Sequence, residues 1–475
     1  MNLHARLTDP HGYQRQIEKL HQKYLGTRRI YELQQSEVSF ASFVLNRATV
    51  ARKICKTVDR GEYRLAPAHV RTIIAGAKER VVFAYRLTDL LVHGVVAGAL
   101  EAAIAPRLSP GLYSYRKGAS WWTAIAALAA YVRAHRTQQP DVRHRGLYVI
   151  RRDIDSYTDS IPVGPTSPLW NMLRSTLCAA DGGAVPAADW QLIETVVRPQ
   201  AFVKEGELFT QYRGVPTGQP ISCVLFNLYL AQLDDQLHRV PGAFYARYCD
   251  DIIFAHPDPS TVRAADTQID AALAPLSLQV SEAKRHDLYV TAAGRPSAEW
   301  PEAKGTAMIP FLGCLISAQG TVSLNRDKRR RLLADLEDRA RRTAKVLRHR
   351  NRDAVGRTVC AAINRALQSR LHFSQQHWAA LLRRAVTDRH DLKQLDYCIA
   401  RIVLRAVTGD AGVRAFRTLP YRTLRADWKL ISLFHARNRW RRGAAARAAA
   451  VATLQRPRAA AVWGYAPAPV PSDLD

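Results

Sequence analysis

Three aspartates stand where this sequence could do metal-dependent chemistry. Asp250 and Asp251 are adjacent, in a short gap between the apolar runs Ala243–Tyr248 and Ile252–Ala255, and Asp153 follows a third apolar run. Two carboxylates about 4 Å apart repel each other by roughly 4 kcal/mol at an effective dielectric constant of about 20, and a divalent cation removes that repulsion. Taken singly, an exposed acidic turn or a strand-terminal aspartate explains each of them as well.

Together the three aspartates can meet at one point if their strands are neighbours. Hard cations such as Mg²⁺ take carboxylate oxygens as ligands. Two such ions about 3.5–4 Å apart clamp the attacking and leaving oxygens of an in-line phosphoryl displacement. Asp155, two residues beyond Asp153, is a competing ligand.

A Gly- and Pro-rich loop over residues 214–222 lies between these acidic stretches and leads into a segment with helical spacing that contains Asn227. Such a loop lets the backbone approach a ligand closely. An ordinary turn has the same composition.

Short apolar runs between turn residues predict the elements that must position these groups. The expected strands are Leu147–Ile150, Ala243–Tyr248 and Ile252–Ala255, with hairpins over residues 70–85 and 202–212. The expected helices are Leu87–Ile104, Trp121–Val132, Leu169–Leu177, Trp190–Val197 and Val224–Leu237.

The composition is that of a globular protein with a basic surface. Of the 475 residues, 47% are hydrophobic, and 69 Lys and Arg face 41 Asp and Glu, giving a formal charge of +28. This excludes a mainly disordered chain and favours a polyanionic partner. The seven cysteines form no C-x-x-C pair, which argues against a disulfide framework or a zinc site.

The sequence predicts a cytoplasmic protein without a membrane partner. The polar amino terminus does not resemble a signal peptide. The most apolar stretch, Leu91–Ala105, contains His93 and Glu101 and is expected to be too short to span a bilayer.

Beyond about residue 325 the sequence becomes helical and strongly basic, with twelve Lys and Arg between Arg326 and Arg352. A helix of this kind can follow a duplex through phosphate contacts, and it can equally be a solvated cationic face. Trp121 and Trp122 could stack on bases, although core positions are the more common role of such a pair.

Taken in order, these strings resemble the palm of a reverse transcriptase. Asp153-Ile154-x-x-Tyr157 is similar to its first catalytic motif, Gly214-x-Pro216-x-Gly218-x-x-x-Ser222 to its template-positioning motif, and Tyr248-x-Asp250-Asp251 to its second catalytic motif. Further similar strings are Lys78-x-Arg80, Tyr113-x-Tyr115-Arg116-x-Gly118, Lys284 and Phe311-Leu312-Gly313-Cys314. The resemblance covers roughly residues 70–325.

The resemblance implies an α+β fold: a right-hand polymerase with fingers, a ferredoxin-like palm and a helical thumb, plus a helical carboxyl-terminal region. The implied divisions are 1–69, an amino-terminal helical region; 70–152, fingers; 153–322, palm, with a finger insertion at about 163–212; 323–375, basic thumb; 376–442, carboxyl-terminal helices; and 443–475, a disordered tail.

The resemblance also implies roles for individual residues. Asp153, Asp250, Asp251 and the backbone of Ile154 would hold two Mg²⁺ ions, with Mn²⁺ as a substitute, and Lys284 would protonate the leaving pyrophosphate. The implied nucleotide contacts are Lys78, Arg80, Tyr157, Thr158, Pro216, Thr217, Gly218 and Gln219. The implied primer grip is Phe311, Leu312 and Gly313, and the implied nucleic-acid contacts are Arg116, Arg329, Arg330, Arg341 and Arg342.

Two positions depart from the family pattern. Thr158 stands where most reverse transcriptases carry an aromatic residue that excludes a ribose 2′-hydroxyl, and Thr217 replaces the usual Gln. We therefore expect weakened sugar discrimination. Besides an RNA-directed DNA polymerase, two alternatives stay open: a template-independent or ribonucleotide-incorporating polymerase, and an inactive nucleic-acid-binding scaffold.

The lineage implied is a bacterial one with a palm like that of group II intron and retron enzymes, and among these a defence-associated or unassigned reverse transcriptase. The partners expected are an RNA template, a DNA product and dNTPs, together with a non-coding RNA, a partner protein and an antiphage role.

Overall fold

The computed structural model describes residues 2–24, 40–75, 78–138, 146–198, 202–204, 206–209, 213–215, 218–368, 378 and 381–438, with the backbone alone at 23–24, 73–75, 78–80, 82, 202, 209 and 383. The described residues divide into two compact units. Unit 1 holds those up to Arg329 together with Arg384–Thr387, and unit 2 holds those from Arg330 onward apart from that short stretch. The predicted tail, 443–475, lies outside the described residues.

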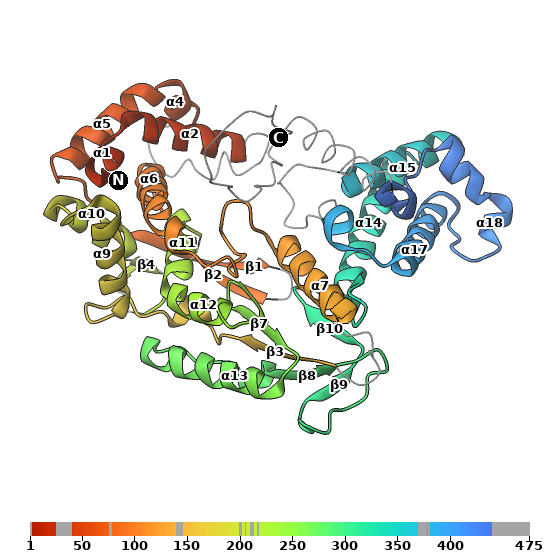
Figure 1. Cartoon of the computed structure of the whole chain (residues 1–475). Coiled ribbons are helices and arrows are strands. Elements are labelled where there is room, and N and C mark those ends of the chain that lie inside the picture. Colours follow the sequence, from red (N-terminus) through yellow and green to blue (C-terminus); the bar gives the residue numbers. More distant parts are fainter. Residues whose placement is uncertain are drawn as a thin grey trace, which may run out of the picture. The chain divides into compact units, whose positions relative to one another are not determined.

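Unit 1 contains both helices and strands, in groups that follow one another along the chain (Figure 1). Its helices are α1 (Leu3–Leu7), α2 (Pro10–Tyr24), α4 (Phe40–Leu45), α5 (Arg47–Asp59), α6 (Leu87–Ile104), α7 (Trp121–Gln138), α8 (Tyr157–Ser160), α9 (Pro168–Asp181), α10 (Ala187–Val197), α11 (Pro220–Tyr229), α12 (Ala231–His238) and α13 (Pro259–Leu273). Its strands are β1 (Ala68–Ala75), β2 (Lys78–Ala84), β3 (Leu147–Asp153), β4 (Phe202–Lys204), β5 (Glu207–Phe209), β6 (Phe244–Tyr248), β7 (Asp251–His256), β8 (His286–Val290), β9 (Lys304–Thr306), β10 (Met308–Phe311), β11 (Cys314–Ser317) and β12 (Val322–Leu324). Short 3₁₀ turns lie at Ala105–Arg107, Ala274–Leu276 and Glu282–Lys284.

A five-stranded sheet in the order β6-β7-β3-β8-β9 lies at the centre of unit 1. The pairs β6–β7, β7–β3 and β3–β8 are antiparallel, and β8–β9 is parallel. Helix α13 packs on β3 and β7, and α12 packs on β6. Because successive residues of β3 and β7 are buried, both faces of the sheet are covered there.

Helix α6 is the central helix of unit 1. It is apolar on all sides and packs against α1, α2, α9, α10 and α11. Within the described ranges it is the one helix that, with its adjoining turn (Leu87–Arg107), is long and apolar enough to cross a membrane. The predicted helix Leu87–Ile104 is confirmed, whereas the expectation that its apolar part is too short to span a bilayer is wrong. Of its apolar window, 72% is buried inside the protein, which is typical of a core helix.

Two smaller sheets have the orders β2-β1-β4-β5 and β10-β11-β12. The predicted hairpins over 70–85 and 202–212 are confirmed as β1–β2 and β4–β5. The single helix predicted over Val224–Leu237 is wrong, because Leu230, at φ −115° and ψ 12°, separates α11 from α12. Leu228, Tyr229, Leu230 and Leu233 are all buried, so the apolar pattern runs through the break and hides it.

Unit 2 is helical in its described part. It contains most of α14 (Arg326–Val346), α15 (Arg352–Gln368), α17 (Arg389–Thr408) and α18 (Ala415–Thr418), with π-helical turns at Leu381–Ala385 and Thr423–Asp427 at its edges. Trp428 packs directly on Gly356 of α15, where an added Cβ would lie 2.3 Å from the indole ring. Its indole N–H donates to Asp353 at 2.5 Å, which fixes the chain after the second π-helical turn to α15.

Candidate active site

The register of the central sheet places the three aspartates together. Asp153, the last residue of β3, is the direct cross-strand partner of Asp251, the first residue of β7. Such partners in an antiparallel pair have Cα atoms about 4.5–5.5 Å apart and point to the same face. Asp250 lies in the two-residue turn between β6 and β7, and its carbonyl accepts a 2.9 Å hydrogen bond from the Ile154 N–H.

The competing ligand, Asp155, is placed differently. Its side chain is exposed, and its N–H donates to the Gln279 carbonyl at 2.9 Å. The Asp153 carbonyl accepts from the Ser281 N–H, so the backbone of residues 153–155 pairs with the backbone of residues 279–281. The geometry thus favours Asp153 over Asp155 as the partner of Asp250 and Asp251.

The carboxylates are crowded and largely buried. Burial raises the pKa of Asp250, and the nearby Asp153 charge raises it further. Burial also raises the pKa of Asp251, which is 7% exposed, and the Arg151 guanidinium opposes that rise. This is the like-charge crowding that the sequence predicts and that a cation relieves.

Two cations of the chain itself lie against these carboxylates. Arg151 donates to both oxygens of Asp251, with Nε–Oδ1 and Nη2–Oδ2 distances of 2.7 Å. The Lys284 ammonium forms an ion pair with Asp153. With these side chains in place, the described part of the chain contains no group of three or more His, Cys, Asp or Glu arranged around a metal position.

Sequence reasoning missed Arg151, although its position in the strand carried the signal. Side chains alternate along a strand, so Arg151 and Asp153 share one face of β3 and Arg152 points to the other. There Arg152, itself buried, binds Asp266 through two 2.6 Å contacts and Asp287 through one of 2.7 Å. The two adjacent arginines therefore form ion pairs on opposite faces of β3.

A buried ion pair lies beside the β6–β7 turn. Arg247 of β6 and Asp234 of α12 are both fully buried and bind through contacts of 2.7 and 2.6 Å. The Tyr245 hydroxyl donates to the same carboxylate at 2.6 Å, and Arg247 Nη1 donates to the Cys249 carbonyl at 3.0 Å. Asp234 raises the pKa of Arg247 against the opposing effect of burial. This pair fixes a turn whose Cys249 has a φ of 61°.

Tyr115 is the exposed aromatic side chain beside this turn. It is 48% exposed, and its hydroxyl lies 4.0 Å from the Cys249 sulfur. The buried Asn227 donates to the Ser114 carbonyl at 2.9 Å, which fixes the Tyr113–Gly118 string to α11. The family resemblance places this string in the fingers but implies no role for Tyr115.

Two predicted nucleotide contacts are core residues and need correction. Tyr157 is 2% exposed, and its hydroxyl donates to the Phe226 carbonyl at 2.6 Å. Gln219 is buried beside Tyr85 and His93. Burial lowers the pKa of His93 to about 3, so Gln219 faces a neutral imidazole and not a phosphate.

Of the remaining predicted nucleotide contacts, the structure describes Thr158 and Gly218 fully and the others in part or not at all. Thr158 is half-buried, and its carbonyl accepts from the Val215 N–H at 2.9 Å, which ties the first motif to the Gly-rich loop. Gly218 is exposed, with a φ of 100° that glycine adopts without strain. Pro216 and Thr217 lie outside the described residues, as do the side chains of Lys78 and Arg80, whose backbones are in β2.

The predicted primer grip is a tight hairpin turn. Leu312 and Gly313 have φ values of 47° and 77°, between β10 and β11. Phe311 is 1% exposed, which corrects its expected contact with a primer, so that only the turn itself is available. Lys328 holds the turn by donating to the Leu312 carbonyl at 2.9 Å, and its ammonium lies 4.2 Å from the Trp121 ring centroid.

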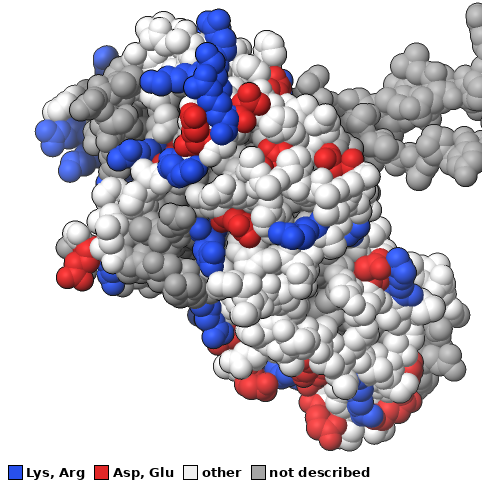
Figure 2. Space-filling view, turned by 90° about the vertical axis from the view of Figure 1, so that its left-hand side faces the viewer, with Lys and Arg blue, Asp and Glu red and all other residues white. Residues whose placement is uncertain are grey.

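The predicted nucleic-acid contacts are mostly exposed arginines of α14. Arg341 and Arg342 share Asp338 at 2.7 Å and are exposed, and Arg329 and Arg330 precede them on the same helix. Arg116 donates to the Ser109 carbonyl at 2.7 Å and so also stabilises a turn. Figure 2 views unit 1 from the side of α1, α5 and α10, where basic side chains gather most densely towards the top, with acidic ones among them.

Comparison with known proteins gives one family match. Residues 94–316 match the family described as Reverse transcriptase (RNA-dependent DNA polymerase). This range includes the three aspartates, Lys284 and the β10–β11 turn. None of the curated proteins matches the chain.

Solved structures similar to this chain include telomerases from two Candida species. Apo telomerase from Candida tropicalis, truncated from its C-terminal domain, has a TM-score of 0.40 at 12% identity, over 60% of this chain and 67% of that one. Telomerase from Candida albicans with a TWJ fragment of telomeric RNA has a TM-score of 0.45 at 11% identity, over 78% and 67%. The corresponding Candida tropicalis complex has a TM-score of 0.41 at 12% identity, over 77% and 64%.

The family match and the sheet that carries the aspartates agree on the nature of the central part of this chain. Residues 94–316 form a reverse transcriptase domain of mixed α and β structure. The chain is therefore a nucleotidyltransferase of the RNA-directed DNA polymerase class.

Proposed function

We propose that this chain copies an RNA template into DNA by a two-metal phosphoryl transfer at Asp153, Asp250 and Asp251. The observation that carries the proposal is the cross-strand pairing of Asp153 with Asp251, beside the turn that holds Asp250. Three carboxylates from separate parts of the sequence are then available on one sheet edge. A phosphoryl-transfer site needs this concentration of oxygen ligands.

The carboxylates fit a pair of magnesium ions by charge and by ligand type. Asp153, Asp250 and Asp251 would be the ligands, with the Ile154 carbonyl as a backbone ligand, and Mn²⁺ would accept the same oxygens. When bound, the ions supply an activated primer hydroxyl and neutralise charge on the transferred phosphate. The raised pKa values of Asp250 and Asp251 are the cost of holding this site without a cation.

Lys284 and Arg151 would then have different roles, Lys284 as a proton donor and Arg151 as a positioning residue. Lys284 is 54% exposed and lies on a 3₁₀ turn, so its long side chain is able to leave Asp153 and reach a leaving pyrophosphate. The Asp153 contact raises the pKa of Lys284, which keeps a proton available for donation. Arg151 binds both oxygens of Asp251 through two guanidinium nitrogens and so orients this carboxylate.

We assign the triphosphate to Lys78 and Arg80, the sugar to Thr158 and the base-pair region to the loop that contains Pro216, Thr217 and Gly218. What supports this is the backbone tie between Thr158 and Val215, which joins the loop to the first catalytic motif. The Leu312–Gly313 turn would meet the primer, and Arg116, Arg329, Arg330, Arg341 and Arg342 would meet backbone phosphates.

Thr158 also favours a second candidate function, incorporation of ribonucleotides by the same site. A threonine is smaller than the aromatic residue of the family pattern, so a 2′-hydroxyl is less strongly excluded. We propose fingers at 70–152, palm at 153–322 and thumb at 323–375 as the divisions of the polymerase.

The biological setting is part of the same proposal. We infer a cytoplasmic bacterial enzyme of the group II intron or retron type that acts in antiphage defence with a non-coding RNA and a partner protein. Sequencing the nucleic acid that copurifies with the chain tests this setting. Recovery of one structured non-coding RNA supports it, and recovery of bulk cellular RNA alone contradicts it.

The polymerase proposal is tested by primer extension on an RNA template with labelled dNTPs. The Asp250→Ala/Asp251→Ala variant should lose incorporation by about 10³-fold or more, because both ligands on β7 and its turn are removed. Its RNA binding, measured by filter retention, should stay within about two-fold of the parent, because phosphate contacts dominate it. Incorporation that survives the double substitution contradicts the assignment.

A further inference from the structure

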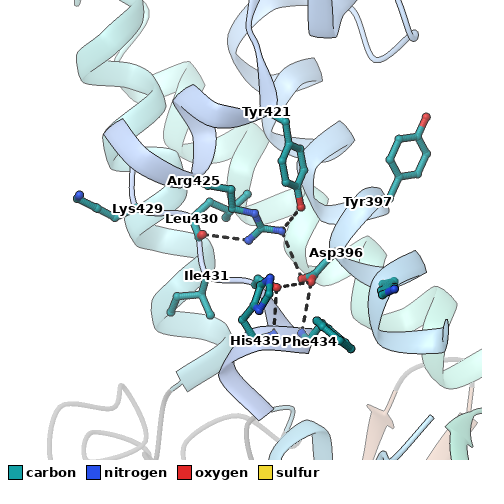
Figure 3. Close-up of a pocket in the computed structure, with 11 residues that line it drawn as sticks. Asp396, Tyr397, Tyr421, Arg425, Lys429, Leu430, Ile431, Phe434 and His435 are labelled. Carbon is teal, nitrogen blue, oxygen red and sulfur yellow. Dashed lines mark hydrogen bonds and ion pairs between the residues drawn. The ribbon is translucent and has the colours of Figure 1, made fainter. Parts of the chain in front are cut away.

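Unit 2 contains an open pocket that the proposed polymerase site does not use (Figure 3). Its volume is about 950 Å³, and its walls come from α17, the π-helical turn Thr423–Asp427 and the segment that follows it. All its lining residues lie beyond residue 390, outside the reverse transcriptase match at 94–316.

Aromatic side chains form one wall of this pocket. Tyr397 and Tyr421 are 44% and 40% exposed, which is unusual for two large aromatic residues so close together. Both contact Phe416, with ring centroids 5.9 Å apart at 15° for Tyr397 and 6.3 Å apart at 41° for Tyr421. The guanidinium carbons of Arg401 and Arg425 lie 5.9 and 4.9 Å from the Tyr397 and Tyr421 ring centroids. The two tyrosines are therefore held in place, partly exposed and next to arginines, a combination found where bases stack.

Cations surround the aromatic wall. Lys393 lies 5.2 Å from the Phe434 ring centroid, and Lys429 and Arg425 complete the lining. Lys429 has a φ of 58°, and its carbonyl accepts from the Asn364 amide at 2.8 Å, so this residue is fixed in a defined conformation. The pocket lining therefore combines two lysines with two partly exposed tyrosines, the kinds of side chain that contact the phosphates and the bases of a single strand.

The acidic residue of the pocket is already neutralised. Asp396 accepts from the Ser432 hydroxyl at 2.6 Å and from the Leu433 and Phe434 N–H groups at 2.7 and 3.3 Å. Figure 3 shows the Arg425 guanidinium between this carboxylate and the Tyr421 hydroxyl, with a further 2.9 Å bond to the Leu430 carbonyl. Asp396 is thus paired with Arg425, and the charge of that guanidinium offsets its own.

The surrounding segment has the same charge bias. Residues 389–438 contain ten Lys and Arg and four Asp, with no Glu. A ligand with repeated negative charges and flat apolar rings is complementary to both features. We propose that this pocket binds a single-stranded segment of nucleic acid, with a base stacked on Tyr397 or Tyr421 and backbone phosphates at Lys393 and Lys429.

The proposal goes beyond the polymerase function and does not rest on it. It adds a second nucleic-acid site in unit 2, for an unpaired strand, distinct from the phosphate contacts proposed for α14. Binding is therefore measured with EDTA present, where no incorporation takes place, so that its result is independent of the catalytic aspartates.

The test is fluorescence anisotropy on the full chain with labelled unstructured RNA of about 12 nucleotides. Tyr397→Leu removes the ring and should weaken binding about ten-fold, whereas Tyr397→Phe keeps the ring and should bind within about two-fold of the parent. The same sequence as DNA shows whether a 2′-hydroxyl contributes. Unchanged thermal unfolding shows that the variants are folded.

Two double variants, each lacking two positive charges, test whether the effect depends on the location of the charges in the pocket. Lys393→Ala/Lys429→Ala should weaken single-strand binding about ten-fold, and Arg414→Ala/Arg417→Ala, which removes two exposed charges of the same unit outside the pocket, should change it less than about three-fold. Crosslinking with a 4-thiouridine oligonucleotide should modify a peptide that contains Tyr397 or Tyr421.

Three results would overturn the proposal. The first is equal binding by Tyr397→Leu and Tyr397→Phe. The second is an equal loss in the pocket and control double variants, which would mean that the charge acts from anywhere on the unit. The third is full competition by pyrophosphate at concentrations that leave ionic strength unchanged, which would make the pocket a site for a small anion.

Discussion

Asp251 is the carboxylate whose surroundings are most constrained, because β7, β3 and the Arg151 fork all fix it. Asp153 and Asp250 are less tightly held, the first by a partly exposed lysine and the second by its backbone alone. At this scale the chemistry is a balance between three carboxylates that repel one another and the cations that offset the repulsion.

The stability of the chain should reflect that repulsion. Since burial raises the pKa of Asp250 in the folded state, the ionised carboxylate opposes folding at neutral pH, and protonation removes the penalty as pH falls through the raised pKa. Asp250→Asn should therefore stabilise the metal-free chain by about 1 kcal/mol at pH 7. Urea unfolding in EDTA between pH 4 and 8 measures this. A gap that widens towards pH 4 would contradict the assignment.

Thr158 sets the expected sugar selectivity. Thr158→Phe restores the aromatic residue of the family pattern and should raise the preference for dNTPs over rNTPs by about ten-fold or more. The comparison is the ratio of kcat/KM values for dTTP and UTP on one RNA template. If the parent chain already discriminates as strongly as the variant, the hypothesis of weakened discrimination fails.

At the scale of elements, the conformation of the β6–β7 turn depends on the buried ion pair between Arg247 and Asp234. Asp234 and Arg247 are both completely buried, so removing one partner leaves an uncompensated charge in the core.

The neighbouring residue supplies a matched control for this ion pair. Asp234→Ala should reduce the free energy of unfolding by about 3–5 kcal/mol. Asp235→Ala removes an exposed pair with Arg239 on the same helix and should cost less than about 1 kcal/mol. Thermal and urea unfolding compare the two variants, and similar losses would show that the buried pair has no special importance.

The strands and their carboxylates were predictable because apolar runs and turn residues are local signals. The break at Leu230 was not, since buried apolar residues continue on both sides of it. Tyr157, Gln219 and Phe311 were assigned to substrate by motif position, whereas packing turns their side chains into the core. Alternation along β3 places Arg151 on the face of Asp153, but its contact with Asp251 depends on the register of β3 and β7, which a single sequence does not show.

At the scale of the molecule, the formal charge of +28 attracts nucleic acid over a longer range than any single contact does. Part of it lies on α14, where Arg341 and Arg342 are exposed and share one aspartate. The charge was evident from composition, but its distribution over two units, and the pocket in the second of them, required the structure.

The contribution of α14 should appear in the salt dependence of duplex binding. Arg341→Ala/Arg342→Ala should lower the slope of log K against log salt concentration by about one to two. An RNA–DNA duplex of fixed length, titrated between about 0.05 and 0.2 M salt, gives the slope. An unchanged slope would place the duplex elsewhere on the protein.

The central claim is that Asp153, Asp250 and Asp251 together hold the ions that drive nucleotide transfer. Electron paramagnetic resonance counts bound Mn²⁺ directly, in a complex of the chain with primer, RNA template and a non-hydrolysable dNTP. We predict about two ions per complex for the parent chain and a loss of at least one in Asp153→Asn. The same ion count in both proteins would contradict the account.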